Sequence, residues 1–213
     1  MSESKAGTTS SGLAAELLVL PISGAPLIFE QLEKHLYRLD DGTFAIKFSI
    51  MGRNYRDSNG RLLRESEVKD SSGNIVPSHN ILTDTVSGSQ IVLMHAGRIA
   101  VRMPMPVSGE PQFSFSASPG SSHERSLMWE DAGRRTIEGV EFVGSRMLQT
   151  AKDDLRLPHT AERWYCDELK LIGAVAVSGP EEAYSIKIQN LRREEPDIKV
   201  FEIPTDYTFV EAQ

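Results

Sequence analysis

The sequence is poor in cysteine, with Cys166 alone among 213 residues. No disulfide can therefore form within the chain, and no pair of cysteines can contribute to a zinc site. The sequence also lacks any run of about 18 consecutive apolar residues, the length that a membrane-spanning helix needs. Hydrophobic residues make up 39% and charged residues 25% of the chain, which is typical of a globular protein with a real core.

An excess of positive charge is also absent. The chain has 23 lysines and arginines against 30 aspartates and glutamates, a net charge of −7. Because non-specific nucleic-acid binding depends on positive charge that displaces counterions, this balance argues against a nucleic-acid partner. Neither a P-loop nor a G-x-G-x-x-G motif is present, so we expect no nucleotide cofactor.

Motifs for metal binding and catalysis are missing as well. No two histidines have the i,i+2 or i,i+4 spacing of metal ligands; they are His35, His79, His95, His123 and His159. There is no G-x-S-x-G motif. A hydrolase would have to rely on Cys166 with His159, or on His123 with Glu124, and nothing beside Cys166 in the sequence activates its thiol. We therefore predict a protein that is not an enzyme, with no catalytic residues, metal or cofactor.

Turn signals rich in Asp, Asn, Ser and Gly are abundant. They recur about every ten to fifteen residues, as in an antiparallel meander; examples are residues 40–42, 57–60, 71–74, 87–88, 96–97 and 178–180. The segments between them alternate apolar and polar side chains or form short apolar runs, which predicts strands. The clearest are residues 43–50, 89–94, 98–103, 169–177 and 183–191.

Two segments need interpretation. Residues 136–147 are predicted to form one strand, bent at Gly139 and Gly144. Residues 28–39 have apolar side chains at helical spacing, yet they lead directly into a turn and a clear strand. We favour a strand, because the arm of a hairpin needs a partner.

These patterns predict a mainly β protein with little helix, built as a single antiparallel sheet. Residues 1–24 are predicted to be a disordered tail and residues 25–210 a single domain. Residues 104–128, rich in proline, serine and glycine, are predicted to be one long flexible loop within that domain. The chain after this loop has too few strands for a core of its own, so both halves are expected to share one sheet.

The segment NYRDSNGRLLRESEV, residues 54–68, is predicted to be a hairpin with a type I′ turn at Asn59-Gly60. An EF-hand register starting at Asp57 fails, because an arginine takes the place of a ligand oxygen. Four arginines lie on or near this hairpin: Arg53, Arg56, Arg61 and Arg64. A solvated strand face of mixed charge is the favoured interpretation. The alternative is a surface that binds an anionic ligand or an acidic protein partner.

Three groups of residues together resemble a known family. They are YRDSNGRLLRE at 55–65; TIEGV at 136–140 with Gly144 and Arg146; and ERWY at 162–165 with the ending N-x-x-x-x-E-P-D…F-x-I-P-x-D-Y-T at 190–208. They are similar to motifs of an uncharacterised family common in acidobacteria, whose members are usually exported. The ending also resembles that of lipoprotein carriers such as LolA and LolB. The carrier resemblance implies a strongly curved, half-barrel-like sheet that cradles an apolar cavity.

The resemblance leads to the functional expectation. We predict a non-enzymatic binding protein that holds an apolar or lipid-like ligand on its curved sheet. The alternative is a protein–protein interaction module that uses the arginines of residues 53–65. Export implies the periplasm or cell envelope, whereas residues 13–25 only faintly resemble a signal peptide, and without one the location would be cytoplasmic. The candidate ligand-lining side chains are Phe44, Phe48, Ile91, Leu93, Trp164, Ile186 and Ile188.

Overall fold

The computed structural model describes residues 18–105, 128–148, 160–179 and 181–212. Within these residues, short connections join strands and a single 3₁₀ helix. The elements are β1 (Leu27–Arg38), β2 (Phe44–Arg56), β3 (Leu62–Asp70), β4 (Ile75–Val76), β5 (His79–Asp84), β6 (Ser89–Met94), β7 (Ile99–Pro104), β8 (Met128–Ile137), β9 (Val140–Leu148), β10 (Thr160–Cys166), β11 (Leu171–Ser178), β12 (Glu182–Arg192), η1 (Ile198–Phe201) and β13 (Thr208–Glu211).

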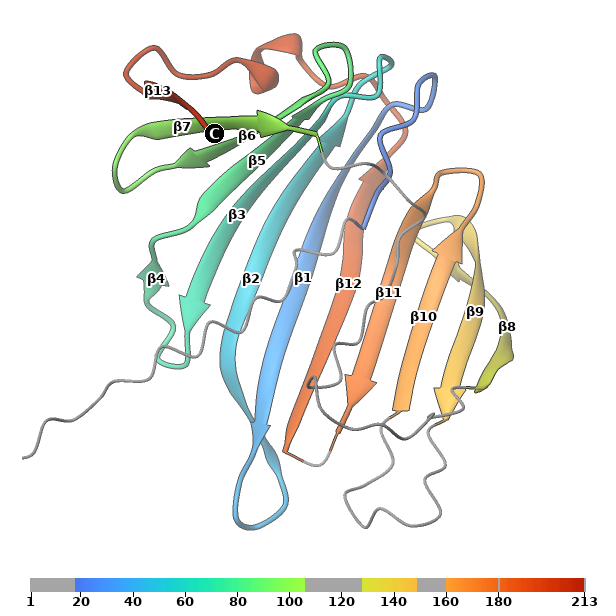
Figure 1. Cartoon of the computed structure of the whole chain (residues 1–213). Coiled ribbons are helices and arrows are strands. Elements are labelled where there is room, and N and C mark those ends of the chain that lie inside the picture. Colours follow the sequence, from blue (N-terminus) through green and yellow to red (C-terminus); the bar gives the residue numbers. More distant parts are fainter. Residues whose placement is uncertain (1–17, 106–127, 149–159, 180, 213) are drawn as a thin grey trace, which may run out of the picture.

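Strand β1 lies inside one large, curved, open sheet, with a wing of strands on either side (Figure 1). The first wing continues through β2, β3, β5, β6 and β7, and the second through β12, β11, β10, β9 and β8. Neighbours within both wings are antiparallel, whereas β13 runs parallel to β7 at one edge. The prediction of a mainly β protein with one curved sheet, shared by both halves of the sequence, is confirmed.

The strand interpretation of residues 28–39 is also confirmed. Leu27, Phe29 and Gln31 are buried while the residues between them are half-buried, which is the period of two that a strand requires. Both edges of β1 are hydrogen-bonded, to β2 and to β12. The predicted hairpin of β11 and β12 is present as well.

Residues 136–147 do not form the single bent strand that was predicted. Strand β8 ends at Ile137 and β9 begins at Val140, and the two strands pair antiparallel. Between them Glu138 and Gly139 have φ angles of 51° and 78°. Positive φ at both central residues is characteristic of a type I′ hairpin turn. Most of the predicted flexible loop, residues 106–127, lies outside the described residues.

Residues 18–25 pack against the sheet, and we call them the N-terminal strap; residues 18–24 of it fall in the predicted tail. Leu18 and Val19 are buried, and the Ile172 amide donates to the Leu18 carbonyl at 2.7 Å. Strand β11 pairs with β12 only over residues 174–178. The strap therefore supplies a backbone partner for β11 where β12 diverges from it.

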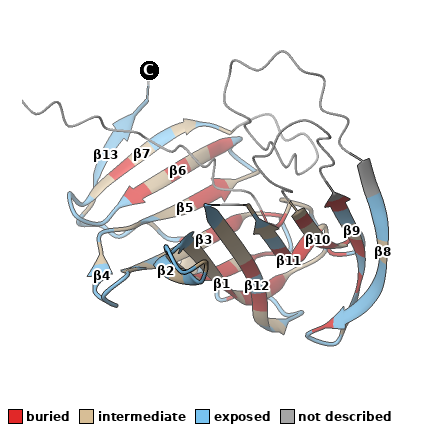
Figure 2. Ribbon diagram, turned by 90° about the horizontal axis from the view of Figure 1, so that it is seen from below, coloured by how far each residue is buried: buried red, intermediate tan, exposed pale blue. Residues whose placement is uncertain are grey.

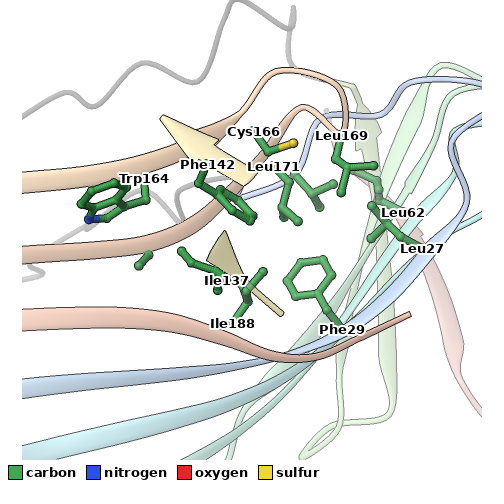
Figure 3. Packing of buried hydrophobic residues seen from close by; sticks show 12 residues of the cluster. Leu27, Phe29, Leu62, Ile137, Phe142, Trp164, Cys166, Leu169, Leu171 and Ile188 are labelled. Carbon is green, nitrogen blue, oxygen red and sulfur yellow. The ribbon is translucent and has the colours of Figure 1, made fainter. Parts of the chain in front are cut away.

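Buried apolar side chains form three core clusters. The first joins both wings, and in Figure 3 Phe29 and Ile188 face Phe142 and Leu171. The second lies on the first wing and contains Leu63, Leu82, Ile91, Leu93, Ala100 and Phe201. The third contains Leu18, Ile172, Val175 and Ile186.

The segment that follows β12 crosses to the first wing and ends as β13 (Figure 1). Phe201 of η1 is buried in the second core cluster, and Val200, Ile203 and Tyr207 pack against that cluster. This C-terminal segment thus covers apolar side chains of β3, β5, β6 and β7. Exposed residues gather on the outer strands, most plainly β13 and β8 (Figure 2).

Candidate functional site

Polar side chains lie among apolar ones on one face of the sheet, around β1. Gln31, Glu33 and His35 are alternate residues of β1 and project to the same face. Asn54 of β2 and Arg64 of β3 share that face by strand register. We call these five residues the polar cluster. The residues opposite Gln31, Glu33 and His35 are Ile188, Ile186 and Tyr184 on β12, and Gly52, Ile50 and Phe48 on β2.

Hydrogen bonds link the polar cluster into a network that converges on Glu33. Its Oε1 lies 2.6 Å from His35 Nε2, and its Oε2 accepts from Gln31 Nε2 at 3.1 Å. Arg64 Nη2 approaches the same Oε2 at 3.4 Å, and Asn54 Nδ2 donates to Gln31 Oε1 at 3.5 Å. The Glu33 carboxylate is therefore well supplied with donors.

Burial and hydrogen bonding act in opposite directions on the charges of this network. Burial by itself raises the pKa of Glu33, but the His35 hydrogen bond and the Arg64 charge outweigh it, so the pKa lies below its ordinary value. Burial lowers the pKa of Arg64, which Glu33 opposes only in part. The polar cluster thus holds a largely buried ion pair at neutral pH, with 14% of the Glu33 and 19% of the Arg64 side chain exposed.

Aromatic and aliphatic side chains border the polar cluster. The His35 ring stacks on Phe48, with ring centroids 4.1 Å apart, and on Tyr184 at 5.8 Å. Ile186 continues the apolar surface into the third core cluster, where it meets Leu18 of the strap. A few convergent polar groups within an apolar surface are typical of sites for small ligands.

The seven side chains predicted to line a ligand site are not brought together. Phe48, Ile186 and Ile188 lie beside the polar cluster, on its face of the sheet, and Ile188 also belongs to the first core cluster. The other four lie elsewhere: Trp164 in the first core cluster, Ile91 and Leu93 in the second, and Phe44, 40% exposed, near the β1–β2 turn. The C-terminal segment of the chain covers Ile91 and Leu93, where a ligand had been predicted to lie.

Arg56 contradicts the interpretation of the hairpin arginines as a solvated face, because it is fully buried. Its Nε donates to the Ala25 carbonyl at 2.7 Å, and its Nη1 donates to those of Leu20 and Leu169 at 2.9 and 2.8 Å. Burial lowers the pKa of Arg56 to about 10. Arg56 therefore holds the N-terminal strap to the sheet at Leu20 and Ala25.

The other three hairpin arginines have different surroundings. Arg61 Nη2 forms an ion pair with Asp57 at 2.7 Å, Arg64 belongs to the polar cluster, and Arg53 is exposed on the opposite face. Arg56, Arg61 and Arg64 are thus engaged within the chain. Recognition of a partner by these four arginines stays a prediction.

The turn at the tip of this hairpin is not the predicted type I′ turn. Gly60 has a φ of 85° but Asn59 does not have positive φ, and the Gly60 amide donates to the Asp57 carbonyl at 3.0 Å. This is a type I turn closed by a left-handed glycine. The Asp57 carboxylate accepts from the amides of Asn59 and Arg61 at 3.0 and 2.8 Å, which fixes the turn.

The same tip attaches segments that are remote in sequence. Both the amide and the hydroxyl of Ser58 donate to the Glu195 carboxylate, which lies in the E-P-D motif. The Ser58 carbonyl accepts from the Gly24 amide at 2.9 Å, and Thr85 Oγ1 donates to the Asn59 carbonyl at 3.1 Å. The first family-like motif therefore serves to hold the strap, the β5–β6 turn and the C-terminal segment together.

The motifs of the second wing also meet in space. Trp164 Nε1 donates to Glu162 Oε1 at 2.7 Å, and Glu162 Oε2 pairs with Arg146 at 3.0 Å. The Trp164 ring lies directly against Gly144, where an added Cβ would come within 2.7 Å of it. The Arg135 guanidinium lies 4.4 Å from the ring centroid. Trp164 is thus committed to packing within the sheet.

The residues of the hydrolase alternative are not seen together. Cys166 is buried in the first core cluster, while His123, Glu124 and His159 lie outside the described residues. In the part of the chain that the structure describes, no group of three His, Cys, Asp or Glu side chains could hold a metal ion. No helix of those same ranges is long and apolar enough to cross a membrane.

No family model matches the sequence, and no curated protein matches it either. Solved structures of related shape exist. The lipoprotein LppX of Mycobacterium tuberculosis is 8% identical with a TM-score of 0.39, over 82% of this chain and 90% of LppX. A LolA superfamily protein of Nitrosomonas europaea is 9% identical with a TM-score of 0.36, over 88% and 94%.

A third such structure is the Pseudomonas aeruginosa MucA/MucB complex, 10% identical with a TM-score of 0.37, over 85% of this chain but only 58% of the other. All three likenesses concern the arrangement of strands alone. The similarity to acidobacterial proteins stays a prediction.

The polar cluster was not predicted from the sequence, although a signal for it exists. Gln31, Glu33 and His35 continue the alternation that buries Leu27 and Phe29. Polar residues on the buried side of a strand are unusual and need partners. The helical spacing of neighbouring apolar residues hid this pattern, and Arg64 and Asn54 come from strands whose register the sequence does not reveal.

Proposed function

We propose that this protein is a non-enzymatic binding protein of the bacterial envelope, which holds a lipid-like ligand against one face of its curved sheet. The polar cluster and the apolar side chains around it support this most. An amphipathic ligand would place a polar group near Glu33 and Arg64 and apolar carbons on Ile50, Ile186 and Tyr184. Each CH₂ group removed from water contributes about 0.8 kcal/mol, so an acyl chain suits such a surface.

The envelope location and the absence of catalysis rest on other grounds. The sequence resembles a family whose members are usually exported. No nucleophile is part of the polar cluster, and its carboxylate, Glu33, accepts hydrogen bonds from Gln31, His35 and Arg64. A carboxylate held in this way serves to organise neighbouring donors better than to abstract a proton.

The test is native mass spectrometry of delipidated protein after exposure to a bacterial lipid extract. We expect adducts of lipid mass on the wild type and their loss in the Ile50→Asn variant, because Ile50 lies on the face of the polar cluster. Met51→Asn is the matched control, since Met51 is the next residue of β2, also half-buried, and projects to the opposite face. A wild-type protein that retains no lipid would refute the proposal, as would equal effects of the two substitutions.

A further inference from the structure

Strands β5, β6 and β7 carry apolar side chains on both of their faces. On one face, Leu82, Ile91 and Leu93 are buried and the C-terminal segment packs over them. On the other face, which is that of the polar cluster, the apolar side chains are half-buried or exposed. An antiparallel sheet that is open to water on one face normally alternates apolar with polar residues. The continuous apolar run of β6, residues 91–94, therefore indicates that this second face is covered too.

Four of these apolar side chains form one continuous row that begins beside the polar cluster. Arg64 of the polar cluster pairs with Ile81 on β5, and Ile81 pairs with Val92 on β6. Val101 of β7 lies opposite Val92, and Val210 of β13 lies opposite Val101. We call Ile81, Val92, Val101 and Val210 the aliphatic row. Because neighbouring strands are about 4.8 Å apart, this row is roughly 14 Å long.

The aliphatic row is open on this face, unlike the corresponding surface of the second wing. Its first three members are half-buried and Val210 is 44% exposed. None of the four belongs to the three core clusters that the described residues form. On the second wing, Leu18 of the strap already packs against Ile172 and Val175. The free apolar surface beside the polar cluster therefore continues into the first wing.

The width of the aliphatic row and the lack of charge around it decide which ligand it suits. On this face β5, β6 and β7, which the structure describes throughout, carry no Asp, Glu, Lys or Arg. Thr83 and Gln90 border the row on one side, and the strands end on the other. A stable protein interface buries about 800 Å² of each partner, far more than four side chains in a line provide. A single unbranched alkyl chain matches both the width and the absence of charge.

The geometry points to a single linear alkyl chain as the ligand, with its polar end at the polar cluster beside Arg64 and its carbons along the aliphatic row. This inference rests on the proposed function and specifies the form of the ligand and its path. Val210 lies on β13, the edge strand of the sheet, so the row ends in water. A longer chain can therefore extend past Val210, but its further CH₂ groups gain no burial there.

The experiment titrates delipidated full-length protein with monoacylglycerols of increasing chain length, from octanoyl to hexadecanoyl, each below its aggregation concentration. We expect the wild-type affinity to rise about two- to fourfold with each added CH₂ group until the chain reaches β13, and then to level off. Val101→Asn should flatten this rise for every chain long enough to reach β7. Val210→Asn should do so only for the longest chains, because Val210 is the last member of the row. Val143→Asn is the matched control, since Val143 is 47% exposed on β9 of the second wing, and it should retain the wild-type rise.

The outcomes separate this inference from the proposed function. A rise that both row variants leave intact overturns the aliphatic row, and the lipid-binding proposal stands. Binding of extract lipids without any monoacylglycerol overturns the single chain in the same way, whereas binding of neither refutes both proposals. An effect of Val210→Asn on shorter chains than those affected by Val101→Asn overturns the stated direction.

Two further results are distinguished by the same samples. A change of oligomeric state in Val101→Asn, seen by native mass spectrometry, shows that a second copy of the protein covers the row, which overturns the alkyl-chain assignment. If circular dichroism shows that Val101→Asn does not fold, Val101→Thr replaces it, because threonine keeps the branched shape and adds one hydroxyl. A wild-type rise in Val101→Thr then overturns the assignment.

Discussion

Gly144 has almost no free space around its α-carbon. A Cβ atom built there would lie 2.7 Å from the Trp164 ring and 2.9 Å from the Ala132 side chain. The indole is itself fixed, by its hydrogen bond to Glu162 and by the Arg135 guanidinium over its face. The ring cannot withdraw without breaking these contacts, so this position admits glycine alone.

We therefore expect Gly144→Ala to lower the free energy of unfolding by about 1–3 kcal/mol, as overpacking of a well-ordered site does. Gly52→Ala is the control, because a Cβ there meets its nearest atoms at ordinary distances of 3.5–3.6 Å. Gly52 also lies in a strand, and its variant should differ from wild type by about 0.5 kcal/mol or less. Urea unfolding followed by tryptophan fluorescence measures both, and equal losses would show that the Trp164 contact is not the cause.

Glu33 gives the fold a dependence on pH with a definite sign. Its pKa is below the ordinary value of 4.5 in the folded state, so its ionised form stabilises the fold at pH values above that range. This contribution is lost as the pH falls through the folded-state pKa. Glu33→Gln should therefore be less stable than wild type at pH 7, by about 1–3 kcal/mol.

The difference between wild type and Glu33→Gln should shrink below about pH 4, because wild-type Glu33 is then increasingly protonated. Glu67→Gln is the control, since Glu67 pairs with Lys69 in an exposed ion pair, and such pairs contribute little. Thermal unfolding between pH 3 and pH 7 makes the comparison. A constant difference across that range would argue against the role of the Glu33 charge.

At the scale of elements, the chain uses one turn design more than once. The turns at residues 57–61 and 70–74 each begin with an aspartate whose carboxylate accepts backbone amides, and each has a left-handed glycine as its fourth residue. The two differ in what lies outside them. Gly60 rests on the backbone of Ile22 in the strap, whereas nothing lies within 4 Å of a Cβ at Gly73.

Alanine substitutions at Gly60 and Gly73 can therefore distinguish the effect of backbone strain on stability from the effect of contact with the strap. Gly73→Ala should lower the free energy of unfolding by about 1–2 kcal/mol, because a residue with a Cβ atom is strained at positive φ. Gly60→Ala should cost about 1 kcal/mol or more in addition, because its Cβ would lie 3.2 Å from the Ile22 carbonyl carbon. It should also raise hydrogen exchange at the Leu20 and Gly24 amides. Identical stability and exchange in the two variants would show that the strap does not depend on this turn.

Local signals in the sequence predicted most strands, because alternation and turn residues act over a few positions. These local signals did not predict contacts between segments that are far apart in the sequence. The pairing of β1 with β12, the parallel β13 and the seating of the strap under Arg56 all join remote segments. The polar cluster depends on the register of three strands at once. The Glu138-Gly139 turn was missed for a local reason, since a glutamate at positive φ is uncommon.

For the whole molecule, the wings are not independent units. Strand β1 pairs with both, and the first core cluster contains Leu62 of β3 in the first wing and Phe142 of β9 in the second. A wing that unfolded alone would expose apolar side chains of the other. The two wings should therefore lose their structure in one cooperative transition.

Hydrogen exchange under mildly denaturing conditions tests this coupling. Central amides of β2 and β11 should exchange with the same free energy of opening and the same denaturant dependence, as in a single global unfolding event. Ile188→Val, at a fully buried position of β12, should lower both by about 0.5–1.5 kcal/mol. Protection that falls in β11 while it persists in β2 would show that the second wing opens by itself.

The place of β1 in the sheet has a consequence for the order in which the chain is made. Its first neighbour, β2, follows at once, but its other neighbour, β12, is synthesised only after nearly all remaining strands. Until then the edge of β1 that later pairs with β12 has unpaired amides and carbonyls beside Leu27 and Phe29. Such an exposed edge promotes association between chains. Completion must also wait for contacts of very long sequence separation, which makes folding slow. A nascent or truncated chain that ends before β12 is therefore far more exposed to aggregation than one that lacks only β13.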